Sequence, residues 1–392
     1  MGIAKNSKFN IRVDFKKSHD SYLFDKNTGR EYLDFFGMYA SLPLGYNHSI
    51  FKTEEFRGEL IGASSFKINN CEFVSDETLE FDRLFKEYAG RGIYKHFHYS
   101  CTGALAVEAA IKACAEYKNH SDIKVLSFNN SFHGVNGYGG FTTSKFYPAN
   151  KKLDNLPQPF SVKVDLTIEQ VLEALTKNNI TCVLIEPIQC SSGDIHHQES
   201  VFRKIYEMAQ AREVPVIHDE IQIGFGGTGK LWHFEHLDMT PDLVVFGKKT
   251  QLSGIMVKDE YGKIFSKGKS TKLEVTWDAD ALDMIRCKYI IKAYKKYDIL
   301  GNVNSRASEL VSELSKVKNI HNLRNKGLIV GFDLPSVPTR DEAVYRMKEN
   351  GLICNVAGST TVRLRPNLAI TQQEIKSGIE IIKQSVREVT RC

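Results

Sequence analysis

The chain has 392 residues, of which 42% are hydrophobic and 25% charged. This is the composition of a globular protein and excludes a largely disordered or low-complexity chain. Lysine and arginine number 52 against 47 aspartates and glutamates, and the charges are interspersed, so the chain lacks the basic stripe of a nucleic-acid-binding protein. No apolar run approaches the ~18–20 residues of a membrane span, and residues 1–6 contain no signal core. We therefore expect a cytoplasmic protein with neither a nucleic-acid nor a membrane partner.

The cysteines are scattered along the chain and form no CxxC pair. Most of them, such as Cys114 and Cys182, stand among apolar residues. Cysteines of this kind are typical of reduced thiols that pack as small hydrophobic side chains. We predict neither a disulfide framework nor a metal site.

Strand-like and helix-like segments alternate through much of the chain. Helical spacing of apolar residues predicts helices over 103–118, 166–178 and 201–213. Short apolar runs predict strands over 124–128, 181–186, 215–219 and 243–246. Strands separated by helices of this length pair in parallel and are covered on both faces. Such sheets bind ligands at the carboxyl ends of their strands, which is where functional residues are expected.

The C-terminal third has the pattern of a smaller α+β domain. A long helix over 282–296 leads out of the large domain. After it we predict helices over 304–316, 340–350 and 372–389, with strands over 327–334 and 361–364. We assign residues 46–285 to the large domain and 286–392 to the small domain. Residues 1–45 are expected to pack with the small domain.

Two candidate site segments lie next to predicted elements, one at the amino end of a helix and the other just after a strand. Small residues over 100–104 lead into the helix that starts at 103, and exposed backbone N–H groups there suit a phosphate. Phe132 and His133 follow the strand at 124–128. Phe132 is able to stack on a flat ring, although a core phenylalanine beside a hydrogen-bonded histidine accounts for the pair better when the two residues are taken alone.

Two further strands end in charged residues. Asp219 ends an apolar strand, where a desolvated carboxylate needs a cationic partner such as a protonated pyridine nitrogen. Its neighbour Glu220 points to the opposite face, so the two acids cannot easily share a metal ion. Lys248 and Lys249 follow the strand at 243–246. They are either a surface loop or a buried lysine whose lowered pKa makes it a carbonyl nucleophile.

Together these features meet the needs of pyridoxal phosphate (PLP): a phosphate cradle, a stacking aromatic, a buried carboxylate and a lysine. The chain resembles the class III, fold-type I PLP-dependent aminotransferases, and among them the L-lysine 6-aminotransferases most closely. The resemblance spans nearly the whole chain. The segments that carry it are 28–34, 103–108, 132–134, 186–189, 219–222, 246–251, 276–277 and 362–366.

The resemblance implies an α/β fold of fold-type I, with a mostly parallel seven-stranded sheet in the large domain. It also implies the cofactor shell. Lys248, with Lys249 as the competing candidate, would form the Schiff base, and Asp219 would keep the pyridine nitrogen protonated. The remaining cofactor contacts would come from Gln222 on the ring 3′-oxygen, Phe132 on the ring face, Gly103 and Ala104 on the phosphate, His133, Glu186, and Thr276 of the partner subunit.

A site shared in this way requires a homodimer. On the substrate side, the resemblance implies that Arg363 binds the carboxylate of the keto acid in a bidentate fork. Tyr39 is expected to contribute to the same substrate site. Once the amine of Lys248 is released from the cofactor, it would move the proton between the donor carbon and the cofactor.

The substrate shell departs from the family pattern at three positions. Ser191 replaces the family's glutamate, which pairs with the arginine here numbered 363. Val135 replaces the arginine that receives the α-carboxylate of lysine, and Glu274 brings a negative charge to the pocket mouth. A charge-assisted hydrogen bond is worth roughly 1.5–3 kcal/mol, so these changes argue against lysine as donor. The chain is also shorter than the family around 145–165, so we expect a different pocket wall there.

We therefore predict an aminotransferase that moves an amino group, from a terminal amine, to a keto acid such as 2-oxoglutarate. The alternative is another PLP reaction on the same shell, namely decarboxylation, racemisation or oxidative deamination. A catalytically inactive binding protein is a third hypothesis, against which the set of Lys248, Asp219 and Gln222 argues.

Overall fold

The structure of the protein is a computed structural model, which describes residues 9–144 and 160–390. The shortened stretch that we expected to alter the pocket wall lies mostly outside these residues. The helices are α1 (Gly37–Ala40), α2 (Glu54–Ser64), α3 (Asp76–Ala89), α4 (Gly103–Lys118), α5 (Gly137–Thr142), α6 (Ile168–Lys177), α7 (Glu199–Gln210), α8 (Ala281–Lys296), α9 (Ile299–Leu314), α10 (Val337–Glu349) and α11 (Gln372–Val389).

A seven-stranded sheet forms the centre of the large domain, in the order β3-β11-β10-β9-β6-β4-β5. Its strands are β3 (His96–Ser100), β4 (Val125–Phe128), β5 (Ser161–Val164), β6 (Cys182–Ile185), β9 (Val216–Asp219), β10 (Leu243–Phe246) and β11 (Ser253–Val257). Only β11 runs antiparallel to its neighbours, β10 and β3. The predicted mostly parallel seven-stranded sheet is confirmed.

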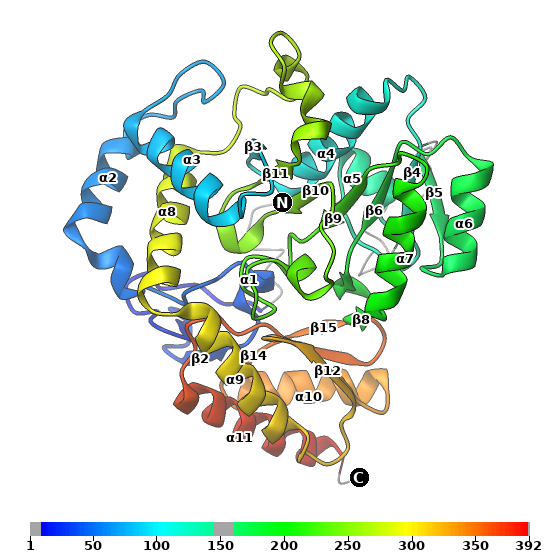
Figure 1. The fold of residues 1–392 in the computed structure, drawn as a ribbon. Coiled ribbons are helices and arrows are strands. Elements are labelled where there is room, and N and C mark those ends of the chain that lie inside the picture. The colour runs from blue at the N-terminus through cyan, green and yellow to red at the C-terminus, as the bar shows by residue number, and fades with distance from the viewer. Residues whose placement is uncertain (1–8, 145–159, 391–392) are drawn as a thin grey trace.

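Helices cover both faces of this sheet because its strands are apolar on both sides. On β6, Cys182 and Leu184 pack with α4, whereas Val183 and Ile185 pack with α6 and α7. The alternation follows from the two-residue period of a strand. Figure 1 shows α6 and α7 lying together beside the strands. The covered sheet fixes the carboxyl ends of β4, β6, β9 and β10 at one edge.

The C-terminal part of the chain has its own sheet, with the strand order β12-β13-β16-β15 and antiparallel pairing throughout. Its strands are β12 (His321–Lys326), β13 (Ile329–Asp333), β15 (Asn355–Ala357) and β16 (Thr361–Leu364). Helices α9, α10 and α11 surround it in the lower part of Figure 1. The α+β character predicted for this region is confirmed.

The predicted start of helix α9 at residue 304 is wrong. The helix begins at Ile299, because the carboxylate of Asp298 accepts a hydrogen bond from the backbone N–H of Gly301 and caps it. The other predicted helices and strands have the expected places in the chain, with ends that differ by up to three residues.

The N-terminal segment joins the C-terminal part of the chain through a small sheet. Strand β2 (Glu31–Asp34) lies in the middle of this sheet and pairs with β1 (Tyr22–Phe24) on one side and with β14 (Leu352–Ile353) on the other. Strands β7 (Ile188–Gln189) and β8 (Ile195–His196) form a separate two-stranded sheet. The boundaries that we placed after residues 45 and 285 stay predictions. No helix in the described part of the chain is long and apolar enough to cross a membrane.

Candidate active site

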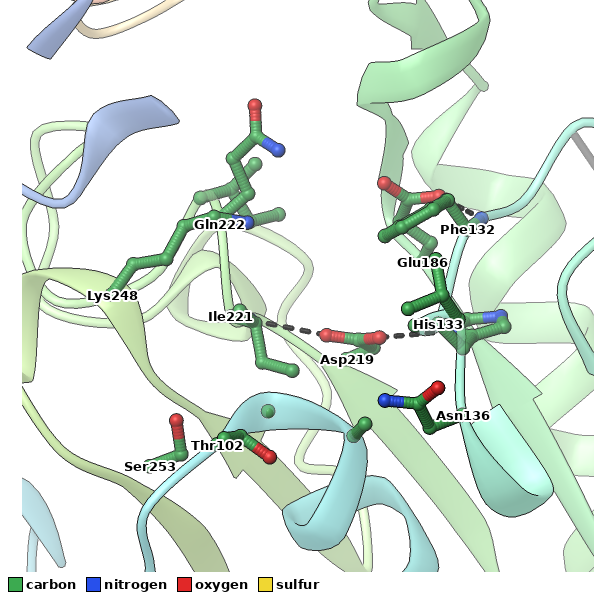
Figure 2. Close-up of a pocket in the computed structure, with 15 residues that line it drawn as sticks. Thr102, Phe132, His133, Asn136, Glu186, Asp219, Ile221, Gln222, Lys248 and Ser253 are labelled. Carbon is green, nitrogen blue, oxygen red and sulfur yellow. Dashed lines mark hydrogen bonds and ion pairs between the residues drawn. The ribbon is translucent and has the colours of Figure 1, made fainter. Parts of the chain in front are cut away.

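A cavity of about 360 Å³ opens at the carboxyl edge of the large sheet. Its lining includes these predicted site residues: Gly103, Ala104, Phe132, His133, Val135, Glu186, Asp219, Gln222 and Lys248. Figure 2 shows Lys248 and Gln222 on one side, Phe132, His133 and Glu186 on the other, and Asp219 between them. Residues far apart in the sequence thus converge because parallel strands end at one edge.

The amino end of α4 forms one wall of the cavity. The hydroxyl of Thr102 accepts a hydrogen bond from the backbone N–H of Leu105 and caps the helix. A Cβ on Gly103 would come within 2.7 Å of the end of the Ile221 side chain, so the helix start packs closely against Ile221. The first N–H groups of a helix have no partner within it and attract anions. This wall is therefore chemically suited to a phosphate group.

Asp219 lies at the centre of the cavity and is 5% exposed. Its Oδ1 accepts a hydrogen bond of 3.1 Å from the backbone N–H of Ile221. Its Oδ2 lies 2.8 Å from Nδ1 of His133, which is buried as well. The Nε2 of His133 has no hydrogen-bond partner among the described residues. The pair places a desolvated, oriented carboxylate where a cationic ring nitrogen would be bound.

Glu186 supports the opposite wall of the cavity. Its two carboxyl oxygens accept hydrogen bonds from the backbone N–H groups of Phe132, at 2.9 Å, and Cys190, at 3.1 Å. Burial, assisted by the negative charge of Asp219, raises the pKa of Glu186 to about 8. A carboxyl group with this pKa is mostly protonated at neutral pH, so Asp219 is the main source of negative charge in the cavity.

The two neighbouring lysines differ in their surroundings. Lys248 lines the cavity and has a left-handed backbone with φ of 55° at the start of the 3₁₀-helix η6 (Lys248–Thr250). Burial, more than the nearby charge of Arg363, lowers its pKa and favours the neutral amine. Lys249 is outside the cavity lining, and its Nζ donates a 2.5 Å hydrogen bond to the carbonyl oxygen of Gln222. The geometry thus favours Lys248 as the reactive lysine.

Arg363, Ser191 and Tyr39 are not part of the cavity lining. Arg363 is 5% exposed on β16; its Nη1 donates to the Cys190 carbonyl oxygen at 3.0 Å, and its Nε has no partner among the described residues. Ser191 is half-buried in the 3₁₀-helix η4 (Cys190–Ser192), next to that carbonyl group. Tyr39 is 45% exposed, and its phenol is close enough to affect the pKa of Arg363, which burial lowers.

Glu274 and Thr276 lie apart from this chain's own cavity lining. Glu274 borders a different cavity with Cys71 and Asp278. Thr276 is exposed on a loop between Val275 and Trp277, which are 44% and 50% exposed. The role expected of Thr276 in the partner subunit's site stays a prediction.

Six residues of the cavity lining are not among the predicted site residues, namely Thr102, Gly134, Asn136, Ile221, Ile223 and Ser253. Ile221 stands between Asp219 and Gln222, so its position in that motif was a usable signal. Ser253 begins β11, and a Cβ on Gly247 would come within 2.7 Å of its hydroxyl oxygen. No sequence signal indicates this contact, since it depends on the antiparallel pairing of β10 with β11.

The structure separates the adjacent acids as the strand geometry predicts. Asp219 faces the cavity, whereas Glu220 accepts hydrogen bonds from the backbone N–H groups of His233 and Phe234.

Within residues 9–144 and 160–390, no group of three or more histidine, cysteine or acidic side chains is arranged to hold a metal ion. Seven cysteines of this part of the chain are free thiols, of which Cys101 is exposed and Cys71 half-buried.

Comparisons with known proteins identify the family of the chain. The family model described as "Aminotransferase class-III" matches residues 3–386. The chain belongs to the class-III aminotransferases. It is 30% identical to the L-lysine-epsilon aminotransferase of Amycolatopsis lactamdurans, over 96% of this chain and 92% of that protein. It is also 28% identical to the 4-aminobutyrate aminotransferase of Schizosaccharomyces pombe, over 91% and 85% of the two chains.

Among solved structures, the fold is similar to that of lysine aminotransferase from Mycobacterium tuberculosis in the internal aldimine form. The TM-score is 0.93 at 28% identity, and the match covers 100% of this chain and 97% of the other. The predicted family, fold type, cofactor and aminotransferase activity are confirmed, and this enzyme uses PLP.

The cavity fits this cofactor on grounds of its own. The side-chain oxygen of Gln222 is buried and has no hydrogen-bond partner among the described residues. A carboxylate, a lysine with a lowered pKa and a helix amino end surround the same space. These groups match the ring nitrogen, the aldehyde and the phosphate of PLP.

Proposed function

We propose that Lys248, Asp219 and Gln222 are the core of the PLP site in this aminotransferase. Bound PLP supplies an electron sink for the bond-breaking step. Asp219, oriented by His133, would hold a proton on the ring nitrogen, and Gln222 would bind the ring 3′-oxygen. Lys248 would hold the cofactor and, once released as a neutral amine, would accept and return the donor's proton. The observation that supports this best is the convergence of all three side chains on one cavity.

The remaining cofactor contacts follow from the walls of the cavity. The backbone N–H groups at Gly103 and Ala104 bind the phosphate, and Phe132 covers one face of the ring. Glu186 holds the backbone of Phe132 in place through a hydrogen bond of 2.9 Å. Because Glu186 is mostly protonated at neutral pH, it positions Phe132 without competing with Asp219 for the cationic ring.

We infer that Arg363 binds the carboxylate of the keto acid, such as 2-oxoglutarate. Two buried guanidinium groups, of Arg363 and Arg365, lie near one buried carboxylate, Asp194. Asp194 forms its ion pair with Arg365, and no ion pair of Arg363 is present in the described residues. This arrangement leaves one buried positive charge for a substrate carboxylate. Ser191, unlike an acidic residue, leaves that charge free in both half-reactions. Tyr39 is close enough to border the same substrate.

The donor carries an amine whose far end is neutral or cationic. Val135 lies at the edge of the cavity and is 48% exposed, so it offers the donor an apolar surface without a cation. If Glu274 of a second subunit reaches the pocket mouth, its carboxylate adds a negative charge there. The α-carboxylate of L-lysine would find no partner at Val135. Binding of lysine therefore lacks one charge-assisted hydrogen bond, which is worth roughly 1.5–3 kcal/mol.

We also infer that the enzyme is a homodimer whose subunits share their sites. Support comes from the exposed loop with Val275, Thr276 and Trp277, because exposed apolar side chains of this size mark contact surfaces. Thr276 of each subunit would reach the phosphate bound by the other. A cytoplasmic location stays a prediction from the sequence.

An absorbance titration of the PLP-loaded protein tests the function. A panel of amines, with L-lysine, 1,5-diaminopentane and 4-aminobutyrate included, is added without any keto acid. We expect an amine with a neutral or cationic far end to convert the cofactor band, and 2-oxoglutarate to restore it. The variant R363A should still be converted by the amine but no longer restored by 2-oxoglutarate. Continued turnover without a keto acid would contradict this proposal and indicate decarboxylation or oxidative deamination.

A further inference from the structure

Lys249 is a buried cation that has no role in the proposed chemistry. It follows Lys248 in η6 and is only 2% exposed. Its Nζ donates a 2.5 Å hydrogen bond to the backbone carbonyl oxygen of Gln222. The packing around it is close, because a Cβ on Gly227 would lie 3.0 Å from the same nitrogen. The amine is therefore fixed against the turn that follows β9.

The surroundings of Lys249 do not favour a positive charge. No ion pair of Lys249 is present in the described ranges, and burial of an unpaired ammonium group costs free energy. Burial, followed by the positive charges of Lys248 and Arg365, lowers its pKa to about 7, while Cys190 and Glu220 act in the opposite direction. A methionine would fill the same space without this cost. Packing alone therefore does not explain a lysine here.

The contact made by Lys249 connects two turns that carry the proposed cofactor ligands. The turn after β9 presents Asp219 and Gln222 to the cavity, and η6 presents Lys248. The bond from Lys249 to the Gln222 carbonyl oxygen ties these two turns to each other.

We propose that Lys249 is a positioning residue of the PLP site, which fixes the turn carrying Gln222 relative to Lys248. This inference rests on the proposed roles of Lys248 as the amine that holds the cofactor and of Gln222 as a ligand of its ring. Lys249 itself touches neither substrate nor cofactor. Its effect reaches the reaction through the position of Gln222.

The test compares three substitutions in the PLP-loaded enzyme. K249M removes both the charge and the hydrogen bond, K249Q retains a donor without the charge, and K249R retains the charge. The readouts are the pH midpoint of the cofactor absorbance band and the affinity for PLP, and neither depends on turnover. We expect K249M to weaken PLP binding about tenfold and to shift the midpoint of the band, because the loss of this hydrogen bond lets Gln222 move away from the ring. K249R, which retains a donor, should stay closer to the wild-type values than K249M.

K249Q guards the test against a K249M protein that does not fold, since it retains a hydrogen-bond donor and should keep more of the PLP affinity. The matched control is K258M, at the far end of β11, where Lys258 forms a 3.0 Å ion pair with Asp242. K258M should lower stability and leave the cofactor band unchanged. Wild-type midpoint and affinity in both neutral Lys249 variants would overturn the proposal for Lys249 alone. A wild-type protein without a cofactor band would instead overturn the role of Lys248.

Discussion

His133 and Asp219 form a buried pair in which Nδ1 of the imidazole lies 2.8 Å from Oδ2 of the carboxylate. The two residues come from the segment after β4 and from the end of β9, and they meet at the centre of the cavity. The pairing fixes the direction in which Asp219 presents its oxygens. A histidine that seemed equally suited to the core is therefore part of the electrostatic arrangement of the site.

Removal of this pairing should weaken the site without removing its charge. We expect H133A to lower kcat/KM about 10- to 150-fold, which corresponds to one hydrogen bond to a charged group. H133N places an amide N–H near the position of Nδ1 and should recover most of the loss. Steady-state kinetics and the position of the cofactor absorbance band measure both effects. An H133A enzyme with wild-type kinetics would show that Asp219 needs no support from His133.

The sequence predicted best those parts of the site that lie within a few residues of a strand end. Asp219 is the last residue of β9, Lys248 comes shortly after β10 and Phe132 shortly after β4, and the parallel arrangement of these strands brings their ends together. Ser253 was out of reach because β11 pairs antiparallel with β10, which apolar runs do not reveal. The small sheet of β1, β2 and β14 was equally hidden, since Leu33 pairs with Leu352 at the other end of the chain.

The sequence also does not predict which buried charges pair with one another. The sequence indicated that Ser191 leaves Arg363 without its acidic partner, but not how the remaining charges are matched. That depends on Asp194, which pairs with Arg365 across two regions distant in the chain. Burial of these groups is a property of the packed fold, so only the structure shows that one guanidinium group stays unpaired within the described residues.

His218 makes the stability of the fold sensitive to acid. It is fully buried on β9, neither ring nitrogen has a hydrogen-bond partner among the described residues, and burial lowers its pKa to about 3. In the unfolded chain its pKa is about 6.5, so the unfolded state binds the proton first as the pH falls. The free energy of unfolding is therefore unaffected by His218 above about pH 7 and decreases below pH 6.5, by about 2 kcal/mol at pH 5.

Urea unfolding at pH 7.5, 6 and 5 measures this loss. H218L should make the free energy of unfolding less dependent on pH by about that amount. The control H321L removes an exposed histidine at the start of β12 and should leave the pH dependence as it is. Equal pH dependence in H218L and the wild type would mean that His218 is not the source of the acid sensitivity.

Shared active sites lead to a complementation experiment. K248A removes the reactive amine, and T276V removes the hydroxyl proposed to reach the partner's phosphate, so each variant alone should be nearly inactive or bind PLP weakly. A mixed dimer of K248A and T276V subunits contains one site with both residues intact. We expect refolded mixtures to regain up to about a quarter of the wild-type activity, since half of the dimers are mixed and each has one working site. A mixture no more active than its parents would contradict the shared site.

Val135 is the position where donor preference should be easiest to change. Its side chain lines the cavity and is 48% exposed, so a longer residue has room to extend. In V135R, a guanidinium group would meet the α-carboxylate of L-lysine when the terminal amine is at the cofactor. We expect kcat/KM for L-lysine to rise at least about tenfold, because a bidentate pair of charge-assisted hydrogen bonds exceeds 1.4 kcal/mol. The gain should be absent with 1,5-diaminopentane, which lacks the carboxylate, and absent in V135L, which adds bulk without charge. An equal gain for both amines would show that residue 135 acts through pocket shape rather than through charge.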